Sequence, residues 1–219
     1  KTQYGYDVDD NLVSVIDPVN NLTRFFYDAR DRLIRETDPL RNSRQSKYDL
    51  VDNLTTQIDR NGRQTDFAYD DLDRLMRETW IGDTQQIDYT YDKLDNLTSV
   101  VDSFSALAYT YDNRDRVKTV DNSGTPNAPS VILEYTYDDV GNVLSVTDTI
   151  EGEIGGTNTY SYDALNRLVE LTQTGNNVSD KRVDFGYNSL GQFTNIDRYS
   201  DIAGTQLAVG TSYTYDELN

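Results

Sequence analysis

The sequence of 219 residues contains no cysteine and no histidine. Without cysteine the chain has no disulfide framework and no thiolate metal site, although this absence does not fix its compartment. Ser-His-Asp and Cys-His catalysis are excluded within the chain, and so are the usual zinc sites. We therefore predict no catalytic, cofactor-binding or metal-binding residues, no cofactor, and no enzymatic activity.

Positive charge is scarce, because 20 Lys and Arg residues stand against 38 Asp and Glu, for a formal net charge of −18. Such an acidic chain repels nucleic acid and anionic membrane surfaces, so neither is an expected partner. No apolar run approaches the ~20 residues that a membrane helix needs, and we expect no membrane insertion.

Apolar residues are also few, at 36% of the chain, and low hydropathy with high net charge is typical of disorder. Disordered chains, however, are poor in aromatic and β-branched residues. This chain has 17 tyrosines and is rich in threonine and valine. We therefore predict a folded, tyrosine-rich, acidic protein.

Ten tyrosines recur at a nearly constant spacing, with intervals of 21, 21, 21, 22, 20, 26, 25, 25 and 28 residues. All but one of them are followed directly by aspartate. A period near 21 residues indicates a repeat architecture. The ten repeat tyrosines are Tyr6, Tyr27, Tyr48, Tyr69, Tyr91, Tyr111, Tyr137, Tyr162, Tyr187 and Tyr215.

Apolar positions on both sides of each repeat tyrosine predict two strands. The residue two positions earlier is aromatic in nine of ten repeats, with Ser46 the exception, and this spacing places both rings on one face of a strand. Six residues after the tyrosine stands an apolar residue that starts a second strand, such as Leu12 or Leu33. The fold class is therefore all-β: antiparallel β-hairpin repeats, with a unit of about 21 residues in about ten copies.

The polar residues between the two strands predict a tight turn. Aspartate after the tyrosine can accept backbone N–H bonds as in Asx-turns, and Gly141 and Gly191 occupy a fourth turn position where positive φ is tolerated. Asp17-Pro18, Asp38-Pro39 and Asn61-Gly62 mark the turns at the opposite ends of the strands. We expect Asn61-Gly62 to form a two-residue hairpin.

The residue five positions after the tyrosine alternates between asparagine and arginine through the first eight repeats, from Asn11 to Arg167. Duplication of a two-repeat block explains this alternation. It also separates equivalent arginines by roughly 19 Å, so each can pair with a turn aspartate instead of facing another arginine.

About 19 or 20 strands are expected, and a sheet of that size must coil into an open spiral or shell-like wall. We predict that residues 1–219 form a single array, regular over 1–120 and with longer repeats and loop insertions over 121–219. Both ends fall within a repeat, so we expect a segment of a longer protein.

Two acidic patterns in the sequence resemble parts of known catalytic or calcium-binding sites. Paired carboxylates suit glycoside hydrolysis, but at a 21-residue period they are turn residues first. Residues 7–11 (DVDDN) resemble the start of an EF-hand loop, yet Leu12 and Pro18 stand where glycine and glutamate are required. Weak calcium binding by rows of turn aspartates stays open.

The strings YDVDDNLVSVID, YDLVDNLTTQID and YDDVGNVLSVTD resemble the YD, or Rhs, repeat. That pattern is Tyr-Asp, two variable residues, glycine, then Asn or Arg before an apolar residue; here aspartate usually replaces the glycine. The resemblance covers essentially the whole chain. Such repeats occur in Rhs proteins, in the C subunits of insecticidal toxin complexes and in teneurins. The resemblance therefore implies a hollow β-walled, β-solenoid-like shell, which in the bacterial members encloses a C-terminal toxin.

The resemblance therefore predicts a shell segment of a secreted or surface-exposed bacterial Rhs-type or toxin-complex protein. Its expected partners are its own flanking repeats and an encapsulated C-terminal domain. Two alternatives stay open: an extracellular adhesion module that binds a glycan or a protein at its rim loops, and a filament subunit that associates end to end.

Overall fold

A computed structural model describes residues 1–82, 85–176 and 178–216, and within these ranges the chain is entirely β-structure and turns. Two compact units are distinguished, one of residues 1–90 with 100–103 and one of residues 91–99 with 104–219. The prediction of antiparallel all-β repeats is confirmed.

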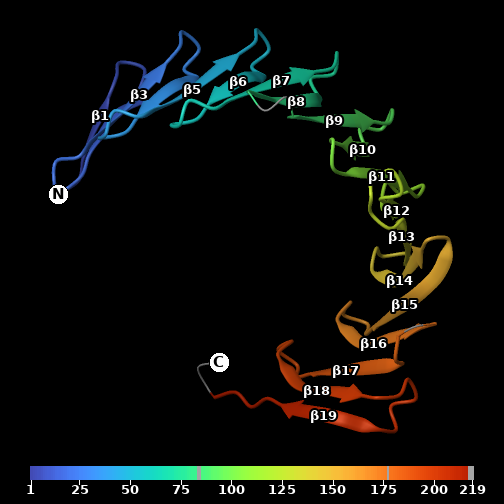
Figure 1. Ribbon diagram of the computed structural model, residues 1–219. Helices are drawn as coiled ribbons and strands as arrows, with labels where there is room; N and C mark the ends of the chain where they lie inside the picture. The colour runs from blue at the N-terminus through green and yellow to red at the C-terminus, as the bar shows by residue number, and fades with distance from the viewer. Residues whose placement is uncertain (83–84, 177, 217–219) are drawn as a thin grey trace. The chain divides into compact units, whose positions relative to one another are not determined.

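The first unit is built from short strands, each antiparallel to the next in the chain (Figure 1). Its strands are β1 (Gln3–Tyr6), β2 (Leu12–Ile16), β3 (Leu22–Tyr27), β4 (Leu33–Thr37), β5 (Ser43–Tyr48), β6 (Leu54–Ile58), β7 (Gln64–Tyr69), β8 (Leu75–Ile81) and β9 (Gln85–Tyr91). As predicted, a repeat tyrosine ends one strand and the apolar residue six positions later starts the next.

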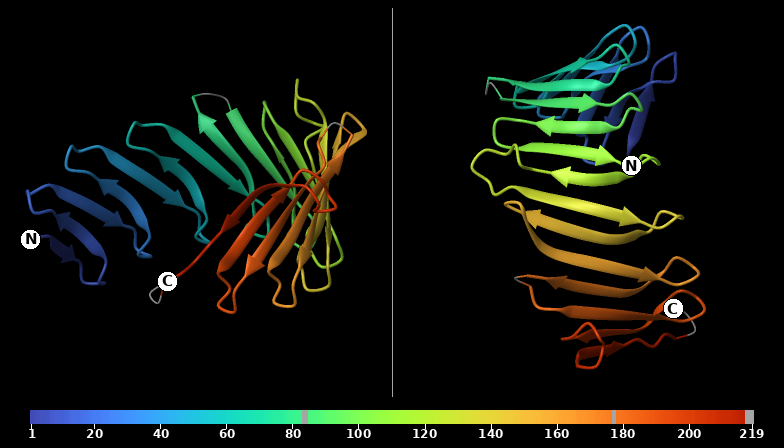
Figure 2. Two further views of the ribbon diagram at one scale, coloured as in Figure 1. Left: turned by 90° about the horizontal axis from the view of Figure 1, so that it is seen from below. Right: turned by 90° about the vertical axis from the view of Figure 1, so that its right-hand side faces the viewer.

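The second unit has the same kind of hairpin, with longer strands from residue 131 onward, and its strands lie side by side in the right-hand view of Figure 2. Its strands are β10 (Leu97–Val101), β11 (Ala106–Tyr111), β12 (Val117–Asp121), β13 (Val131–Tyr137), β14 (Val143–Ile150), β15 (Glu153–Tyr162), β16 (Leu168–Gly175), β17 (Lys181–Tyr187), β18 (Phe193–Tyr199) and β19 (Leu207–Ser212). Some of the extra residues after 120 therefore lengthen strands, such as β14 and β15, and others form loops, such as 122–130.

A β-bulge recurs beside the repeat tyrosine. In the hairpin of β3 and β4, Phe26 pairs with Arg35 but Tyr27 pairs with Leu33, so one residue of β4 is left over. The same shift occurs in seven further hairpins of the described chain. Because a bulge bends a strand and increases its twist, each hairpin is bent at its tyrosine end.

No side chain is buried within the described ranges, although many are partly shielded. A single layer of sheet cannot form the two-layer core on which most domains depend. The strands must therefore be held by their backbone pairing and by side-chain contacts between neighbouring hairpins. Those contacts concentrate at the turns.

Candidate functional site: the turns and the links between repeats

Each turn that follows a repeat tyrosine, here called a YD turn, is organised by its first aspartate. In the turn 28–32, Asp28 Oδ1 accepts the backbone N–H groups of Arg30 (2.9 Å) and Arg32 (3.2 Å), and Asp28 Oδ2 accepts Arg32 Nε at 2.8 Å. The backbone N–H of Asp28 donates to the carbonyl of Arg32 at 3.0 Å. This closes a three-residue loop whose last residue, Asp31, has φ of 59°.

Positive φ at the fourth turn position is a general feature of the YD turns, as predicted from Gly141 and Gly191. Aspartate and asparagine tolerate this conformation better than other residues with a side chain. The φ values are between 57° and 75° at the six aspartates and 58° at Asn166. The six are Asp10, Asp31, Asp52, Asp73, Asp95 and Asp115.

The turns at the opposite ends of the first strands have the same construction, which the sequence analysis missed. Asp17 accepts the N–H groups of Val19 (2.8 Å) and Asn21 (2.9 Å), and Asn20 has φ of 67°. The sequence contains a pattern that could have revealed these turns: an aspartate, three further residues, and then Asn or Arg. Successive copies of this pattern begin alternately 10 and 11 residues apart. They begin at Asp7, Asp17, Asp28, Asp38, Asp49, Asp59 and Asp70.

The prediction of a two-residue hairpin at Asn61-Gly62 is wrong. Gly62 has φ of 80°, whereas Asn61 is not among the residues with positive φ, as a two-residue type I′ turn would require. Instead, Asp59 accepts the N–H groups of Asn61 (2.8 Å) and Arg63 (3.0 Å) and closes a three-residue loop. The aspartate two residues before the Asn-Gly pair therefore decides the turn type.

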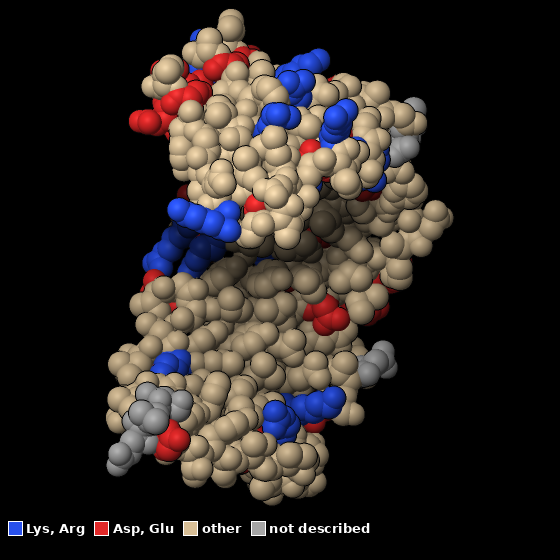
Figure 3. Space-filling model, turned by 90° about the vertical axis from the view of Figure 1, so that its left-hand side faces the viewer, with Lys and Arg blue, Asp and Glu red and all other residues tan. Residues whose placement is uncertain are grey.

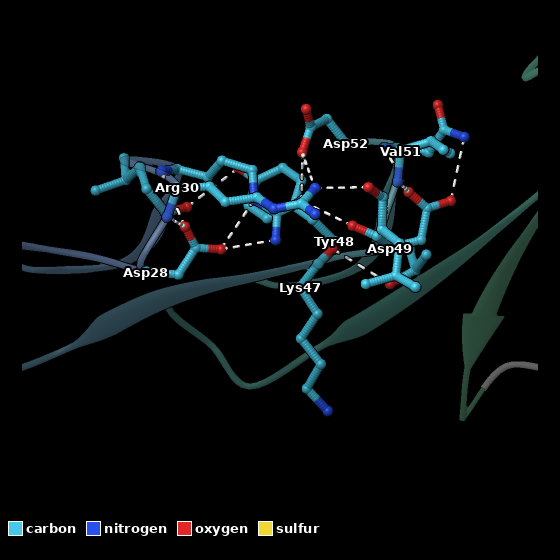
Figure 4. A network of polar contacts seen from close by, with 12 residues as sticks. Asp28, Arg30, Lys47, Tyr48, Asp49, Val51 and Asp52 are labelled. Carbon is cyan, nitrogen blue, oxygen red and sulfur yellow. Dashed lines mark hydrogen bonds and ion pairs between the residues drawn. The ribbon is translucent and has the colours of Figure 1, made fainter.

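The residue five positions after the tyrosine links its own YD turn to that of the next repeat. Asn11 Nδ2 donates to Asp31 at 2.8 Å, and Arg32 Nη1 donates to Asp52 Oδ1 and to the carbonyl of Asp49, each at 2.7 Å. The alternation of asparagine and arginine thus alternates two chemical forms of one link, here called the rung. Figure 4 shows the network of polar contacts between the turn of Asp28 and that of Asp49 and Asp52. Further rungs join Asn53 to Asp73, Asn96 to Asp115, Arg116 to Asp138, Asn142 to Asn166 and Arg167 to Asn188.

The predicted pairing of these arginines with turn aspartates is confirmed. Arg32 contacts Asp28 at 2.8 Å as well as Asp52, and Arg74 lies 2.7 Å from Asp70. Their side chains are about one-fifth exposed, so the pairs are better shielded than ordinary surface ion pairs. Equivalent pairs are Arg116–Asp112 and Arg167–Asp163.

The repeat tyrosines form a second set of links. Tyr27 donates its hydroxyl hydrogen to the carbonyl of Leu12, in the preceding hairpin, at 3.0 Å. The backbone pairing of β2 with β3 runs only from Ile16–Leu22 to Ser14–Arg24, so the tyrosine bridges the two hairpins beyond the end of that pairing. The same bond joins Tyr48 to Leu33, Tyr69 to Leu54, Tyr111 to Leu97, Tyr137 to Val117, Tyr162 to Val143 and Tyr187 to Leu168.

Where the rung is an arginine, it also lies over the next repeat tyrosine. The guanidinium carbon of Arg32 is 4.8 Å from the centre of the Tyr48 ring. The corresponding distance is 4.4 Å for Arg116 over Tyr137 and 4.7 Å for Arg167 over Tyr187. These separations are in the range of cation–π attraction, so rung and tyrosine support one another.

The bonds at the turns shift the ionisation of the groups that make them. The hydrogen bond from Arg116 is the main cause that lowers the pKa of Asp112 to about 2, and the bond from Arg32 similarly lowers the pKa of Asp28. Burial raises the pKa of Tyr69 and of Tyr111. These shifts keep Asp28 and Asp112 ionised as acceptors near neutral pH, and keep Tyr69 and Tyr111 neutral as donors.

The first carboxylate of each turn described above accepts hydrogen bonds from its own turn. No group of three or more Asp or Glu side chains placed to hold a metal ion occurs in the ranges that the structure describes. In the EF-hand-like stretch, Asp7 already accepts N–H groups of Asp9 and Asn11.

On the face drawn in Figure 3, charged side chains form separate groups among uncharged residues. No helix in the described ranges could cross a membrane.

Strand, bulged turn and inter-repeat links together define a protein of antiparallel β-hairpin repeats. Residues 2–43, 48–79 and 137–178 match the family model of the RHS repeat. Because these matches cover more than half of the 219 residues, the chain belongs to the RHS repeat family, as the resemblance predicted.

Solved structures with a similar fold include a crystal structure of TcdB2-TccC3-Cdc42, at 15% identity and a TM-score of 0.60 over 90% of this chain and 13% of that one. Another is a Photorhabdus luminescens Tc holotoxin pore, at 15% identity and a TM-score of 0.58 over 97% and 14%. This chain thus spans about one-seventh of the chains it matches, and at such identities the likeness concerns the fold. None of the curated proteins compared with it matches.

Proposed function

We propose that this chain forms part of the wall of a shell that encloses a toxin or effector domain, in a secreted or cell-surface bacterial protein. The observation that carries the proposal is the set of rungs and tyrosine bonds that recurs within each of the two units, in a sheet with no buried side chain among the residues that the structure describes. Within each unit these links join one hairpin to the next. The wall of a shell, if it is a single layer of sheet, depends on such links between neighbouring hairpins because it has no two-layer core.

The similar solved structures support the proposal at the level of the fold. Their names concern TcdB2-TccC3 complexes and a Tc holotoxin pore, so the compared fold occurs in toxin assemblies. The much greater length of those chains agrees with a role for residues 1–219 as one portion of a larger protein, in which flanking repeats continue a single array. This segment itself is proposed to be non-catalytic.

Apolar residues at the tips of the YD turns supply a surface for contacts within such an assembly. Leu72, Leu94, Leu165 and Leu190 each stand at the third position of a YD turn and are 67–75% exposed. An exposed apolar side chain at the tip of a turn suits contact with another protein surface. We assign these turn tips to contacts with further parts of the same shell, beyond the neighbouring repeats.

The proposal is tested on the natural polypeptide that contains this segment. Electron microscopy should show closed hollow particles, and limited proteolysis should leave the sequence that follows the repeats intact until the shell is unfolded in urea. Open fibres would favour end-to-end assembly instead. A downstream sequence that is cleaved as quickly before as after unfolding would contradict encapsulation.

Adhesion to a glycan is the competing function, because tyrosine rings can stack on sugars. In most repeat tyrosines the hydroxyl group already donates a hydrogen bond to a backbone carbonyl, and this favours a structural role for these tyrosines. Binding on a glycan array that is lost when Tyr109, Tyr135 and Tyr160 are changed to alanine would support adhesion over encapsulation.

A further inference from the structure

One repeat lacks the aromatic residue that the others place two positions before the repeat tyrosine. Ser46 stands there, whereas the flanking repeats have Phe25 and Phe67. Because side chains alternate along a strand, Ser46 and Tyr48 lie on the same face of β5. The small side chain therefore leaves a gap in a row of rings.

The gap is a cavity of about 280 Å³. Leu33, Tyr48 and Leu54 provide its apolar lining, and Arg35, Glu36, Arg44, Ser46 and Gln57 provide polar groups. Strand pairing places six of them on one face, since Ser46 pairs with Gln57, Glu36 with Arg44 and Tyr48 with Leu54. The space is open to solvent on one side, and its volume exceeds the roughly 150 Å³ of an enclosed apolar cavity that holds benzene, so there is room for an aromatic ring.

A hydrogen bond and an ion pair hold several of the lining residues in place. The Tyr48 hydroxyl donates to the carbonyl of Leu33 at 3.1 Å, which keeps two of the apolar residues together. Glu36 forms an ion pair with Arg60 from the neighbouring turn. Leu33, Tyr48 and Glu36 are thus already held by contacts within the chain, and a ligand need not order them.

Charge at the cavity favours an acidic ligand. The carboxylate of Glu36 is neutralised by Arg60, whereas Arg44 is exposed and makes no ion pair with any residue in the described part of the chain. A carboxylate placed next to a bound ring would meet the Arg44 guanidinium, which binds carboxylates well.

We propose that the Ser46 cavity receives an aromatic side chain of a partner polypeptide, at a position where that partner has a neighbouring acidic residue. The ring takes the place that the chain's own phenylalanine or tyrosine fills in nine other repeats, and Arg44 pairs with the acid. The inference does not depend on encapsulation, since it rests only on the missing ring at Ser46 and on the Arg44 guanidinium beside it.

The test uses the full chain, labelled with nitrogen-15, and the peptide acetyl-Asp-Phe-Asp-amide as probe. Titration should shift the backbone amide signals of Ser46, Leu54 and Gln57. The peptides acetyl-Asp-Leu-Asp-amide and acetyl-Lys-Phe-Lys-amide should bind more weakly, because the first lacks the ring and the second repels Arg44.

Two matched variants test the cavity itself. Ser46→Phe should fill the space, weaken binding of the Asp-Phe-Asp peptide by at least about tenfold and leave the melting temperature equal or higher, whereas Ser46→Ala should bind normally. Arg44→Gln should weaken binding of the acidic peptide and leave that of the Lys-Phe-Lys peptide equal or stronger.

Three results would overturn the proposal. The first is an absence of shifts around Ser46 with the Asp-Phe-Asp peptide, and the second is equal binding by the Ser46→Phe variant. The third is a Ser46→Phe variant that is less stable than the natural chain or does not fold, since a ring would then not fit the cavity.

Discussion

The hydroxyl of Tyr69 donates a 2.9 Å hydrogen bond to the carbonyl of Leu54, which belongs to the preceding hairpin. This bond connects a side chain that ends β7 with the backbone at the start of β6. Their registered backbone pairing begins only at Thr56 and Asp66. A tyrosine of the repeat therefore acts on the hairpin before its own.

Tyr69→Phe should destabilise the chain by about 0.5–1.5 kcal/mol, because it removes this bond and leaves the ring in place. Urea denaturation followed by circular dichroism measures the change. Tyr109→Phe is the matched control, since no hydrogen bond of the Tyr109 hydroxyl occurs in the described ranges. Equal losses in the two variants would show that the bond to Leu54 does not contribute.

Asp70→Asn should lower the melting temperature by a few degrees, because Asp70 accepts the N–H groups of Leu72 and Arg74 and pairs with the Arg74 guanidinium. Asp71→Asn makes the same change of charge one residue later, at a side chain with no contact of this kind in the described chain. Its melting temperature should change little. A similar decrease in both variants would mean that net charge, not turn geometry, is responsible.

Arg32→Asn should retain more stability than Arg32→Ala. Asparagine occupies this position in alternate repeats, where Asn11 and Asn53 reach the next turn at 2.8 Å. Alanine removes the rung, the bond to Asp28 and the contact over the Tyr48 ring together. Denaturant midpoints of the two variants decide the matter, and an equally stable alanine variant would refute a stabilising role for the rung.

Stability should decrease as the pH falls from about 5 toward 2. The folded chain lowers the pKa of Asp28 and Asp70, and that of Asp112 to about 2. A lowered folded-state pKa stabilises the protein above the unfolded value of about 3.9, and this contribution is lost as protonation reaches the folded value. Denaturant midpoints at pH 7, 4 and 2.5 measure the loss.

Arg116→Gln is the informative variant for this pH dependence. It removes the main cause of the lowered Asp112 pKa, so it should be less stable at pH 7 but lose less stability between pH 5 and 2. An acid dependence identical to that of the natural chain would show that Asp112 does not contribute to it.

Much of the fold follows from short-range patterns. The position of Leu33 six residues after Tyr27 predicts where β4 begins, because the turn between them has a constant length. Gly141 and Gly191 predict positive φ at the aspartates in the same position. The turn at Asn61-Gly62 was predicted wrongly because a two-residue preference was considered without the carboxylate of Asp59 nearby.

The sequence by itself determined the hairpin repeat, the construction of each YD turn and the pairing of arginine with aspartate, because all of these act within a few residues. Only the tertiary structure decided that Arg32 also reaches Asp52, that Tyr69 bonds to Leu54 and that Ser46 leaves a cavity. Those relationships join different hairpins. They depend on strand register and on how far neighbouring hairpins separate at the tyrosine end, which a 21-residue spacing does not specify.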